Sequence, residues 1–330
     1  MNSAQPSKYR HIYGTTKSKS GYDCVKPRSA RDANLIKVNS TMVAVQWDTP
    51  GYGALLVLPA RDQPTSEPSK KEQRLPSNPP LLEPHTSFIQ DFDFSPFEDS
   101  LLATSDGNCI RLWQIPCEGI QKTVREPNVE IKNSDGKILG IQFHQTSKNL
   151  MLSTHHNHDI KIFDIDHDSA SILCNSGHQD IVQRTSWDWY GALLATSCRD
   201  KNLRIIDPRN NQITHCVLAH ESIKGFTLTW LGQRDQIATV GFSKDGRRQL
   251  SAWDVRSFSK PLASLNIGAG SGMVTPCHDP TTDVIFLLGK GDTYISYYVI
   301  EDTSPFLSYL SEFKTSESQS DVAPFPPQNS

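Results

Sequence analysis

Residues 193–207, LLATSCRDKNLRIID, hold the pattern that decides the fold: an apolar strand, a polar turn, and a strand in which apolar and polar residues alternate. A close counterpart, LLATSDGNCIRLWQ, occupies residues 101–114. Alternation with a period near two is typical of β-strands, whereas a helical repeat would show a period near 3.6. The two stretches therefore predict a protein built from repeated β-hairpins.

The hairpin recurs in four copies, and another alternating strand precedes it in each. The copies begin at His85, Gly136, His178 and His220. Their last strands end on bulky residues separated by 50, 43 and 47 positions, namely Trp113, Phe163, Ile206 and Trp253. A period of roughly 40–45 residues with three strands and a return loop is typical of a WD-repeat propeller blade. With degenerate copies at 42–59 and 273–300, the sequence predicts an all-β WD-repeat β-propeller.

A well-formed WD blade holds a buried hydrogen-bonded set of His, Ser or Thr, Asp and Trp, and the copies keep parts of it. The residues kept are His85, Thr104 and Trp113 in the first copy, His178, Thr196 and Asp200 in the third, and His220, Thr239 and Trp253 in the fourth. Ile206 replaces the Trp of the third copy, and the shorter turn of the first copy puts Asp106 out of register. We expect these side chains to be buried and structural rather than catalytic.

The run HHNHD at residues 155–159 is the densest group of metal-ligand side chains in the sequence. In the second copy it falls where the third copy has CRDKN, the turn between the second and third strands. A structural metal needs three or four converging ligands, and a tight turn points consecutive side chains in different directions. We therefore predict a solvated turn and no metal site.

The composition argues against a nucleic-acid-binding, a secreted or a membrane-spanning protein. The net charge is −3 and the pI about 6.4, so no global field draws the chain to nucleic acid. The seven cysteines are odd in number and form no CxxC pair, which favours reduced thiols in a cytoplasmic protein. The N-terminus has no apolar signal region, and no apolar run approaches the roughly 18 residues of a membrane span.

Catalytic and cofactor motifs are also lacking in the sequence. GAGSG at 268–272 has Met273 where a dinucleotide fingerprint needs its third glycine. GKGD at 289–292 lacks the spacing of a phosphate-binding loop, and no GxSxG nucleophile elbow occurs. We expect a non-enzymatic protein with no catalytic residues and no cofactor.

Four segments occur together and in order: SKYRHIYG at 7–14, LRIIDPR at 203–209, TVGFSKDGRRQLSAWD at 239–254, and HDPTTDVIFLLGKGDTYISYYVIEDTSPFLSYLSEF at 278–313. This combination resembles the coronin family of actin-binding propeller proteins, over roughly residues 7 to 313. GKGD followed by SPFLSYL is its most specific part, because generic WD proteins do not share it.

The resemblance implies binding to filamentous actin, a place in the cytoplasm at the cell cortex, and other cytoskeletal partners. In the family, a basic position shortly after a Tyr-Asp pair contributes to actin binding; in YDCVKPRSAR (22–31) the matching residues are Lys26 and Arg28. The alternative is a generic WD-repeat adaptor in a cytosolic multiprotein complex. In that case Trp189 is either a contact anchor or packed on Tyr190.

The resemblance also implies seven blades, with strands from both ends of the chain in the last blade. Tyr9–Tyr13 and Phe306–Phe313 are the only candidate strands, which predicts an incomplete seventh blade within a propeller at residues 7–313. The Pro-rich segment 59–84 is expected to loop out between blades, and the Ser/Pro-rich segment 314–330 to be a disordered tail. Because no sustained heptad follows, the oligomerisation of coronin coiled coils is not carried over, and we expect a monomer.

Overall fold

The computed structural model describes residues 22–23, 25, 27, 34–60, 73–85, 87–133, 136–166, 172–174, 177–315, 318–321 and 323. The chain divides into two compact units. We call residues 16–174 with 321–330 the N-terminal unit, and residues 1–15 with 175–320 the C-terminal unit. The described residues form strands almost throughout; the one helical element among them is the short 3-10 turn η1 (Val255–Ser257).

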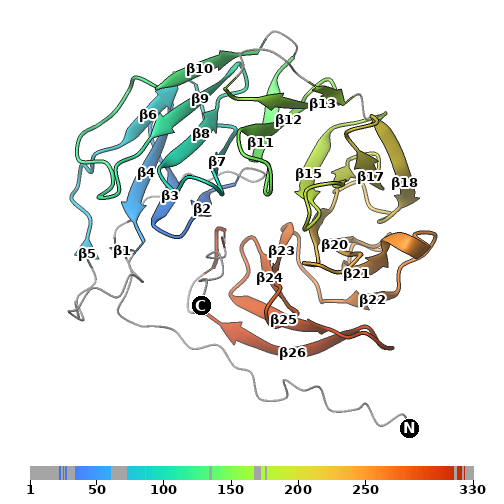
Figure 1. Cartoon of the computed structure of the whole chain (residues 1–330). Helices are drawn as coiled ribbons and strands as arrows, with labels where there is room; N and C mark the ends of the chain where they lie inside the picture. The colour runs from blue at the N-terminus through green and yellow to red at the C-terminus, as the bar shows by residue number, and fades with distance from the viewer. Residues whose placement is uncertain are drawn as a thin grey trace. The chain divides into compact units, whose positions relative to one another are not determined.

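The N-terminal unit contains three four-stranded antiparallel sheets, each made of strands close in sequence (Figure 1). The first sheet is β2 (Ile36–Val38), β3 (Met42–Trp47), β4 (Gly53–Pro59) and β6 (Leu82–His85). The second is β7 (Asp91–Phe94), β8 (Leu101–Ser105), β9 (Cys109–Gln114) and β10 (Val129–Lys132). The third is β11 (Ile138–Phe143), β12 (Leu150–His155), β13 (Ile160–Asp164) and β14 (Ile172–Cys174). A short parallel pair joins β1 (Tyr22–Asp23) to β5 (Gln73–Arg74).

The C-terminal unit contains three more sheets of the same form. The fourth sheet is β15 (Val182–Trp187), β16 (Leu194–Cys198), β17 (Asn202–Asp207) and β18 (Gln212–Leu218). The fifth is β19 (Thr227–Trp230), β20 (Gln236–Phe242), β21 (Arg248–Asp254) and β22 (Ala263–Asn266). The sixth is β23 (Val274–Asp279), β24 (Val284–Gly289), β25 (Tyr294–Ile300) and β26 (Leu307–Lys314). The all-β prediction is confirmed, and the six sheets correspond to the six copies found in the sequence.

Consecutive sheets of a unit pack face to face through the apolar side chains that the alternation predicts. One core cluster lies between the first two sheets and includes Met42, Leu55, Phe92 and Trp113. Another lies between the β15–β18 and β19–β22 sheets and includes Phe226 and Trp253. Leu102, Leu194 and Ile237, each on a second strand, have no exposed surface. Burial of this kind is the main stabilising contribution.

Polar side chains on the first strands connect neighbouring sheets. Asp91 accepts hydrogen bonds from the backbone amide of Ile141 (3.0 Å) and from the side chain of Asn34 (2.9 Å). Two residues along β7, Asp93 accepts from the amide of Phe143 (2.9 Å). In the C-terminal unit, Ser186 accepts from the amide of Trp230 (3.2 Å). Such bonds satisfy amides that the ladder of a first strand leaves unpaired.

Two expectations about segment boundaries are wrong. Phe306–Phe313 does not belong to an incomplete blade, because β26 pairs with β25 and completes a four-stranded sheet. The other candidate strand, Tyr9–Tyr13, lies outside the described residues. The segment 59–84 is not a loop throughout, since Leu82–His85 forms β6 and Leu75, Leu81 and Leu82 are buried. The tail is described in part, and Gln319 exchanges backbone hydrogen bonds with Gly291 and Asp292, each 2.8 Å long.

Candidate functional site

A histidine–threonine contact recurs in the first, third and fourth copies. The histidine Nε2 lies 3.0, 2.8 and 3.0 Å from the threonine Oγ1 in the pairs His85–Thr104, His178–Thr196 and His220–Thr239, respectively. The three threonine side chains have no exposed surface. Because His85 ends β6 and Thr104 lies on β8, the contact joins the last strand of one sheet to the second strand of the next.

A tryptophan completes the contact in two of the copies. The indole Nε1 of Trp113 donates to Thr104 Oγ1 (3.0 Å), and that of Trp253 donates to Thr239 Oγ1 (2.9 Å). Both indoles are buried. The third copy has Ile206 in this place, fully buried, and thus lacks the donor. These side chains are buried, hydrogen-bonded positions of the core.

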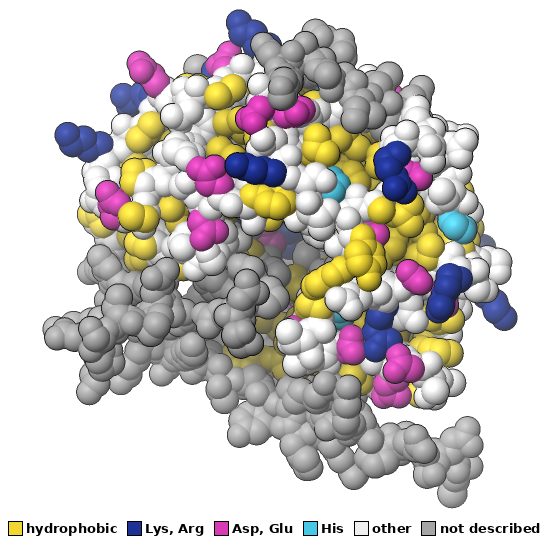
Figure 2. Space-filling view, viewed as in Figure 1, with side chains coloured by type: hydrophobic (Ala, Val, Ile, Leu, Met, Phe, Trp, Pro, Cys, Tyr) yellow, Lys and Arg dark blue, Asp and Glu magenta, His cyan; other side chains and the backbone are white. Residues whose placement is uncertain are grey.

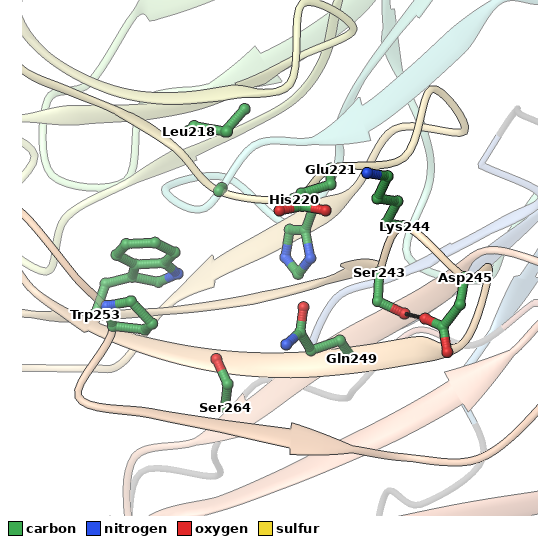
Figure 3. A pocket seen from close by; sticks show the side chains of 11 residues that line it. Leu218, His220, Glu221, Ser243, Lys244, Asp245, Gln249, Trp253 and Ser264 are labelled. Atoms are coloured by element: carbon green, nitrogen blue, oxygen red, sulfur yellow. Dashed lines mark hydrogen bonds between the residues drawn. The ribbon is translucent and has the colours of Figure 1, made fainter.

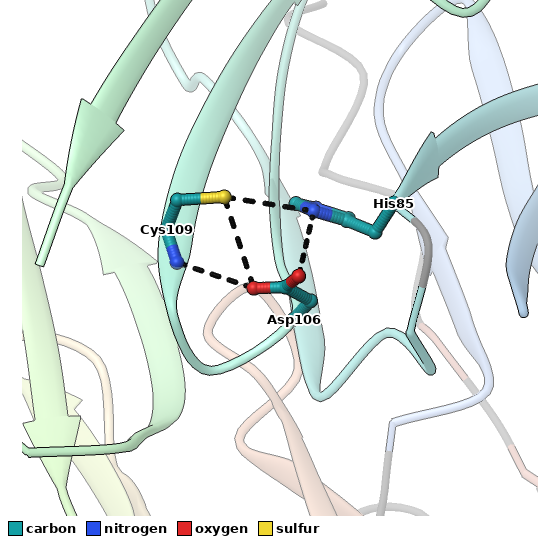
Figure 4. Close-up of side chains that lie close together, drawn as sticks. All are labelled: His85, Asp106 and Cys109. Carbon is teal, nitrogen blue, oxygen red and sulfur yellow. Dashed lines mark hydrogen bonds and ion pairs between the residues drawn. The ribbon is translucent and has the colours of Figure 1, made fainter.

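The sequence predicted that Asp106 of the first copy would be out of register with His85, but the structure places its carboxylate beside the histidine ring. Its Oδ2 lies 3.4 Å from His85 Nδ1, and Ser87 donates to the same oxygen (3.0 Å), as Figure 4 shows in part. Gly107, at φ +98°, turns the chain so that Asp106 Oδ1 accepts from the amides of Asn108 (2.8 Å) and Cys109 (3.1 Å). The shorter turn thus brings the carboxylate to the histidine.

Of the residues described, only His85, Asp106 and Cys109 bring three potential metal-ligand atoms within 4.8 Å of one another. Burial raises the pKa of Cys109 to about 11, and Asp106 adds to that shift, so the thiol keeps its proton at neutral pH. Asp106 already accepts hydrogen bonds from Ser87, Asn108 and Cys109. A metal would have to displace the thiol proton and these hydrogen bonds, and the hydrogen bonds alone are sufficient to explain the group.

In the third copy, Asp200 pairs with Arg204, whereas the sequence suggested that it would join the hydrogen-bonded set of His178. Its carboxylate forms two hydrogen bonds with the guanidinium of Arg204 (3.0 and 2.6 Å), and both side chains are nearly buried. It also accepts a long bond (3.4 Å) from the amide of Gln179, which follows His178. Burial acts to raise the pKa of Asp200, but the bonds from Arg204 and from the Asn202 amide outweigh it and hold that pKa at about 2.

The two glycine-rich motifs surround one buried arginine. Arg248 donates from Nε and Nη2 to the carbonyl of Gly272 (3.1 and 2.9 Å) and pairs with the carboxylate of Asp292. A Cβ on Gly270 would lie 2.3 Å from Arg248 Cζ, and one on Gly289 would lie 2.0 Å from Asp292 Oδ2. GAGSG and GKGD therefore leave room for an ion pair between two sheets, which explains them without a phosphate ligand.

The HHNHD run contains a strand end and a turn. His155 is the last residue of β12 and is buried, with Nε2 2.8 Å from Ser153 Oγ. His156 and Asn157 are exposed, and His158 has a φ of +73°. The prediction of a solvated turn fits residues 156–158 but not the buried His155.

The structure does not describe the two residues expected to contact actin. Lys26 and Arg28 lie outside the described residues, but Pro27 between them forms an antiparallel β-bridge with Trp47. Elsewhere, Figure 2 shows basic and acidic side chains interspersed over the face in view. None of the helical structure described is long and apolar enough to cross a membrane.

Comparisons with known proteins identify the class of the fold. Residues 79–114 and 170–207 match the family described as WD domain, G-beta repeat, and residues 2–65 match one described as a domain of unknown function (DUF1899). The crystal structure of the WD40 domain from Toxoplasma gondii coronin matches with a TM-score of 0.78 and 28% identity, covering 90% of this chain and 75% of that one. With the repeated four-stranded sheets, these matches define an all-β WD-repeat β-propeller protein.

The relatives identify the family. The chain is 35% identical to the coronin-like protein crn1 of Schizosaccharomyces pombe, over 97% of this chain and 52% of that protein. It is 31% identical to coronin-A of Dictyostelium discoideum (95% and 68%) and 29% identical to human coronin-2A (97% and 60%). The chain belongs to the coronin family, and it spans about half to two thirds of the length of these relatives.

Proposed function

We propose that the chain is a non-enzymatic, cytoplasmic actin-filament-binding protein of the cell cortex that binds as a monomer. The observation that supports this most is the similarity to coronins over 95–97% of the chain. A monomer engages the filament through a single site without avidity, whereas linking two sites raises apparent affinity by roughly 10²–10⁴. We therefore expect weak binding.

Within this proposal, Lys26 and Arg28 contribute part of the contact. Pro27, which lies between them in the sequence, is exposed and forms a β-bridge with Trp47 of the first sheet. Exposed charges contribute on the order of 1 kcal/mol each and are screened by salt. The double change Lys26→Asp and Arg28→Asp should accordingly weaken filament binding several-fold at low salt.

Co-sedimentation with actin filaments tests both statements. The purified chain should pellet with filaments at low salt and less at high salt, with a longer coronin as positive control. The double variant should pellet less while its far-UV circular dichroism stays unchanged. If the chain fails to pellet under conditions where the longer coronin does, the filament proposal is wrong. If the chain pellets and the double variant pellets equally well, the filament proposal stands but the assignment of Lys26 and Arg28 is wrong.

An adaptor role is the second candidate, and one surface feature favours it. Trp189 and Tyr190, in the turn between β15 and β16, are 42% and 67% exposed. Large exposed aromatic side chains are frequent anchors in protein interfaces. An adaptor without filament affinity would not pellet in the assay above, whereas a filament-binding chain carrying Trp189→Ser and Tyr190→Ser should pellet as before.

A further inference from the structure

A segment of the second sheet covers the edge of the first. The connection between β9 and β10, residues 115–128, crosses β6, and Val124 forms a parallel bridge with Leu82. The Val124 amide donates to the Leu81 carbonyl (3.0 Å), and the Glu83 amide donates to the Val124 carbonyl (2.9 Å). We call residues 115–128 the strap. It shows how an outer strand of this protein accepts an extended segment.

Two side chains of the strap complement the strand that they cover. Val124 lies with Leu82 and Trp113 in the lining of one pocket. Arg125, the next residue, donates from Nε to the Glu83 carboxylate (2.7 Å). The strap thus places an apolar side chain against an apolar one and a basic side chain against an acidic one.

β18 is the counterpart of β6 in the fourth sheet. β6 ends at His85 and β18 ends two residues before His220, and the two histidines make equivalent threonine contacts. Counted back from these histidines, residues 216–218 correspond to residues 81–83. In the part of the chain that the structure describes, β18 pairs with β17 alone, and the shorter connection 255–262 after β21 forms no bridge to it. Hence this edge has no strap.

The hydrogen-bonding groups at the edge of β18 are placed as they are in β6. The Ala219 amide donates to the Lys201 carbonyl (3.0 Å), and Leu218 lies opposite Asn202 in the ladder. In an antiparallel ladder, hydrogen-bonded pairs alternate with pairs that are not hydrogen-bonded. The amide of Leu218 and the carbonyl of Cys216 therefore point away from β17, as the corresponding groups of β6 point to the strap.

β18 lacks the features that protect other outer strands. Its sequence, QITHCVL, has no acidic residue, lysine, arginine or proline, and Ile213 and Leu218 are 42% and 55% exposed. Sheets usually protect an outer strand with charges, proline or a covering segment. In β6, Glu83 and the strap serve this purpose. The uncharged edge of β18 matches an uncharged extended segment of a partner.

A groove beside β18 corresponds to the pocket that the strap covers. It has a volume of about 550 Å³, and its lining includes Trp253, the counterpart of Trp113. Figure 3 shows Leu218 on one side of the groove and Ser264 on the other. A side chain placed as that of Val124 is on β6 would enter this groove. The charged residues of the lining lie at the other end from the tryptophan in this view, namely Glu221, Lys244 and Asp245.

We propose that the edge of β18 binds an uncharged, extended segment of a partner protein by parallel β-strand addition. An amide of the segment donates to the Cys216 carbonyl, and the carbonyl of the same residue accepts from the Leu218 amide. Its apolar side chain enters the groove beside Trp253, and the next side chain covers Leu218. Because Leu218 stands where β6 has Glu83, an apolar residue replaces the arginine of the strap. The inference goes beyond filament binding and does not depend on it.

Three peptides that keep the Thr-Val pair of the strap test the proposal. They are fluorescein-Ser-Gln-Thr-Val-Leu-Gln-Ser-amide, the same peptide with Arg in place of Leu, and the Leu peptide with a methylated valine nitrogen. Fluorescence anisotropy measures their binding to the full chain. The Leu peptide should bind about 10-fold more tightly than the Arg peptide, because its leucine buries apolar surface on Leu218.

The methylated peptide reports on the backbone bonds. It cannot donate to the Cys216 carbonyl, so it should not bind, whereas the Leu peptide should slow hydrogen exchange of the Leu218 amide. Equal affinities of the Leu peptide and its methylated form would overturn the proposal. Absence of binding of the Leu peptide at millimolar concentration would overturn it as well.

Substitutions supply the matched controls. Leu218→Glu gives β18 the carboxylate that β6 has, so it should reverse the order and make the Arg peptide the tighter ligand. Ile223→Glu adds the same charge on the segment before β19, where Ile223 is 76% exposed, and should leave the order unchanged. An unchanged order in a folded Leu218→Glu chain, or a reversal in both variants, contradicts the site.

A second copy of the chain is the other possible occupant of this edge. Size-exclusion chromatography with light scattering distinguishes the two cases, and the chain alone should be monomeric at micromolar concentration. A dimer that dissociates on Leu218→Glu would show that β18 pairs with itself, and the proposal of a separate partner would be wrong.

Discussion

Arg248 and Asp292 form a buried ion pair that joins the β19–β22 sheet to the turn between β24 and β25. The guanidinium is 2% exposed and the carboxylate 16% exposed. The two residues are 44 positions apart, and the glycines of both glycine-rich motifs surround them closely. The pair gives the GKGD motif, the most specific part of the coronin resemblance, a structural role.

Asp292→Asn should destabilise the fold strongly. It removes the negative charge that compensates Arg248 and leaves a buried cation, a change that costs about 3–5 kcal/mol in typical proteins. Urea unfolding followed by tryptophan fluorescence measures the loss. Asp245→Asn is the matched control, because its pair with Arg247 is exposed on both sides and such pairs contribute at most about 1 kcal/mol. Similar losses in the two variants would show that burial does not set the importance of the pair.

The threonine contacts predict an order of stabilities. Thr104→Val and Thr239→Val each remove the partner of a buried histidine and of a buried tryptophan, whereas Thr196→Val removes only the partner of His178. An unsatisfied buried group costs about 1–3 kcal/mol, so the first two variants should lose about twice as much unfolding free energy as the third. Equal losses in denaturant unfolding would mean that the indole bonds contribute nothing.

The buried histidines predict acid sensitivity above pH 4. Burial lowers the pKa of His85 and of His220 to about 4, below the 6.5 of an exposed histidine. Between these values the unfolded chain binds more protons, so the free energy of unfolding should fall as the pH decreases from about 6.5 to 4. His85→Gln should flatten this part of the curve while keeping an acceptor for the Thr104 hydroxyl. An unchanged slope in that variant would show that His85 does not titrate as its burial requires.

The HHNHD run should bind no zinc with structural affinity. His155 is buried at the end of β12, whereas His156 and His158 lie on the turn, so the three rings do not converge on a common metal position. Calorimetry should show no stoichiometric zinc binding below micromolar concentration. Tight binding that disappears with His156→Ala and His158→Ala would refute the prediction.

The sequence predicts well whatever depends on local pattern. Alternation identified the strands, and the repeat identified the buried residues Thr104, Trp113 and Trp253. It could not place Asp106, because counting positions assumes one turn geometry, whereas Gly107 at positive φ allows a tighter turn that restores the contact.

Pairing between distant segments was harder to predict. Alternation says that a segment is a strand but not which strand it joins, so β26 was assigned to a separate blade. The Arg248–Asp292 pair has no local pattern of its own. Outer strands such as β18, largely exposed, carry little apolar signal to reveal them.

The pairing of β26 predicts strong protection at the C-terminal end of the last sheet. Its residues pair with β25 from Ile300–Leu307 to Tyr294–Lys314, and the rings of Tyr298 and Tyr309 meet edge to face at 5.5 Å. Amides that donate within this ladder should exchange with solvent hydrogen slowly, because they open only with the sheet. Native-state hydrogen exchange on the isolated chain should show protection within Leu307–Lys314 comparable to that within β21. Tyr309→Gly should speed exchange locally by removing the ring contact, whereas Thr281→Ala, in the turn before β24, should leave it unchanged. Fast exchange throughout Leu307–Lys314 in the unsubstituted chain would mean that this strand is not stably paired in solution.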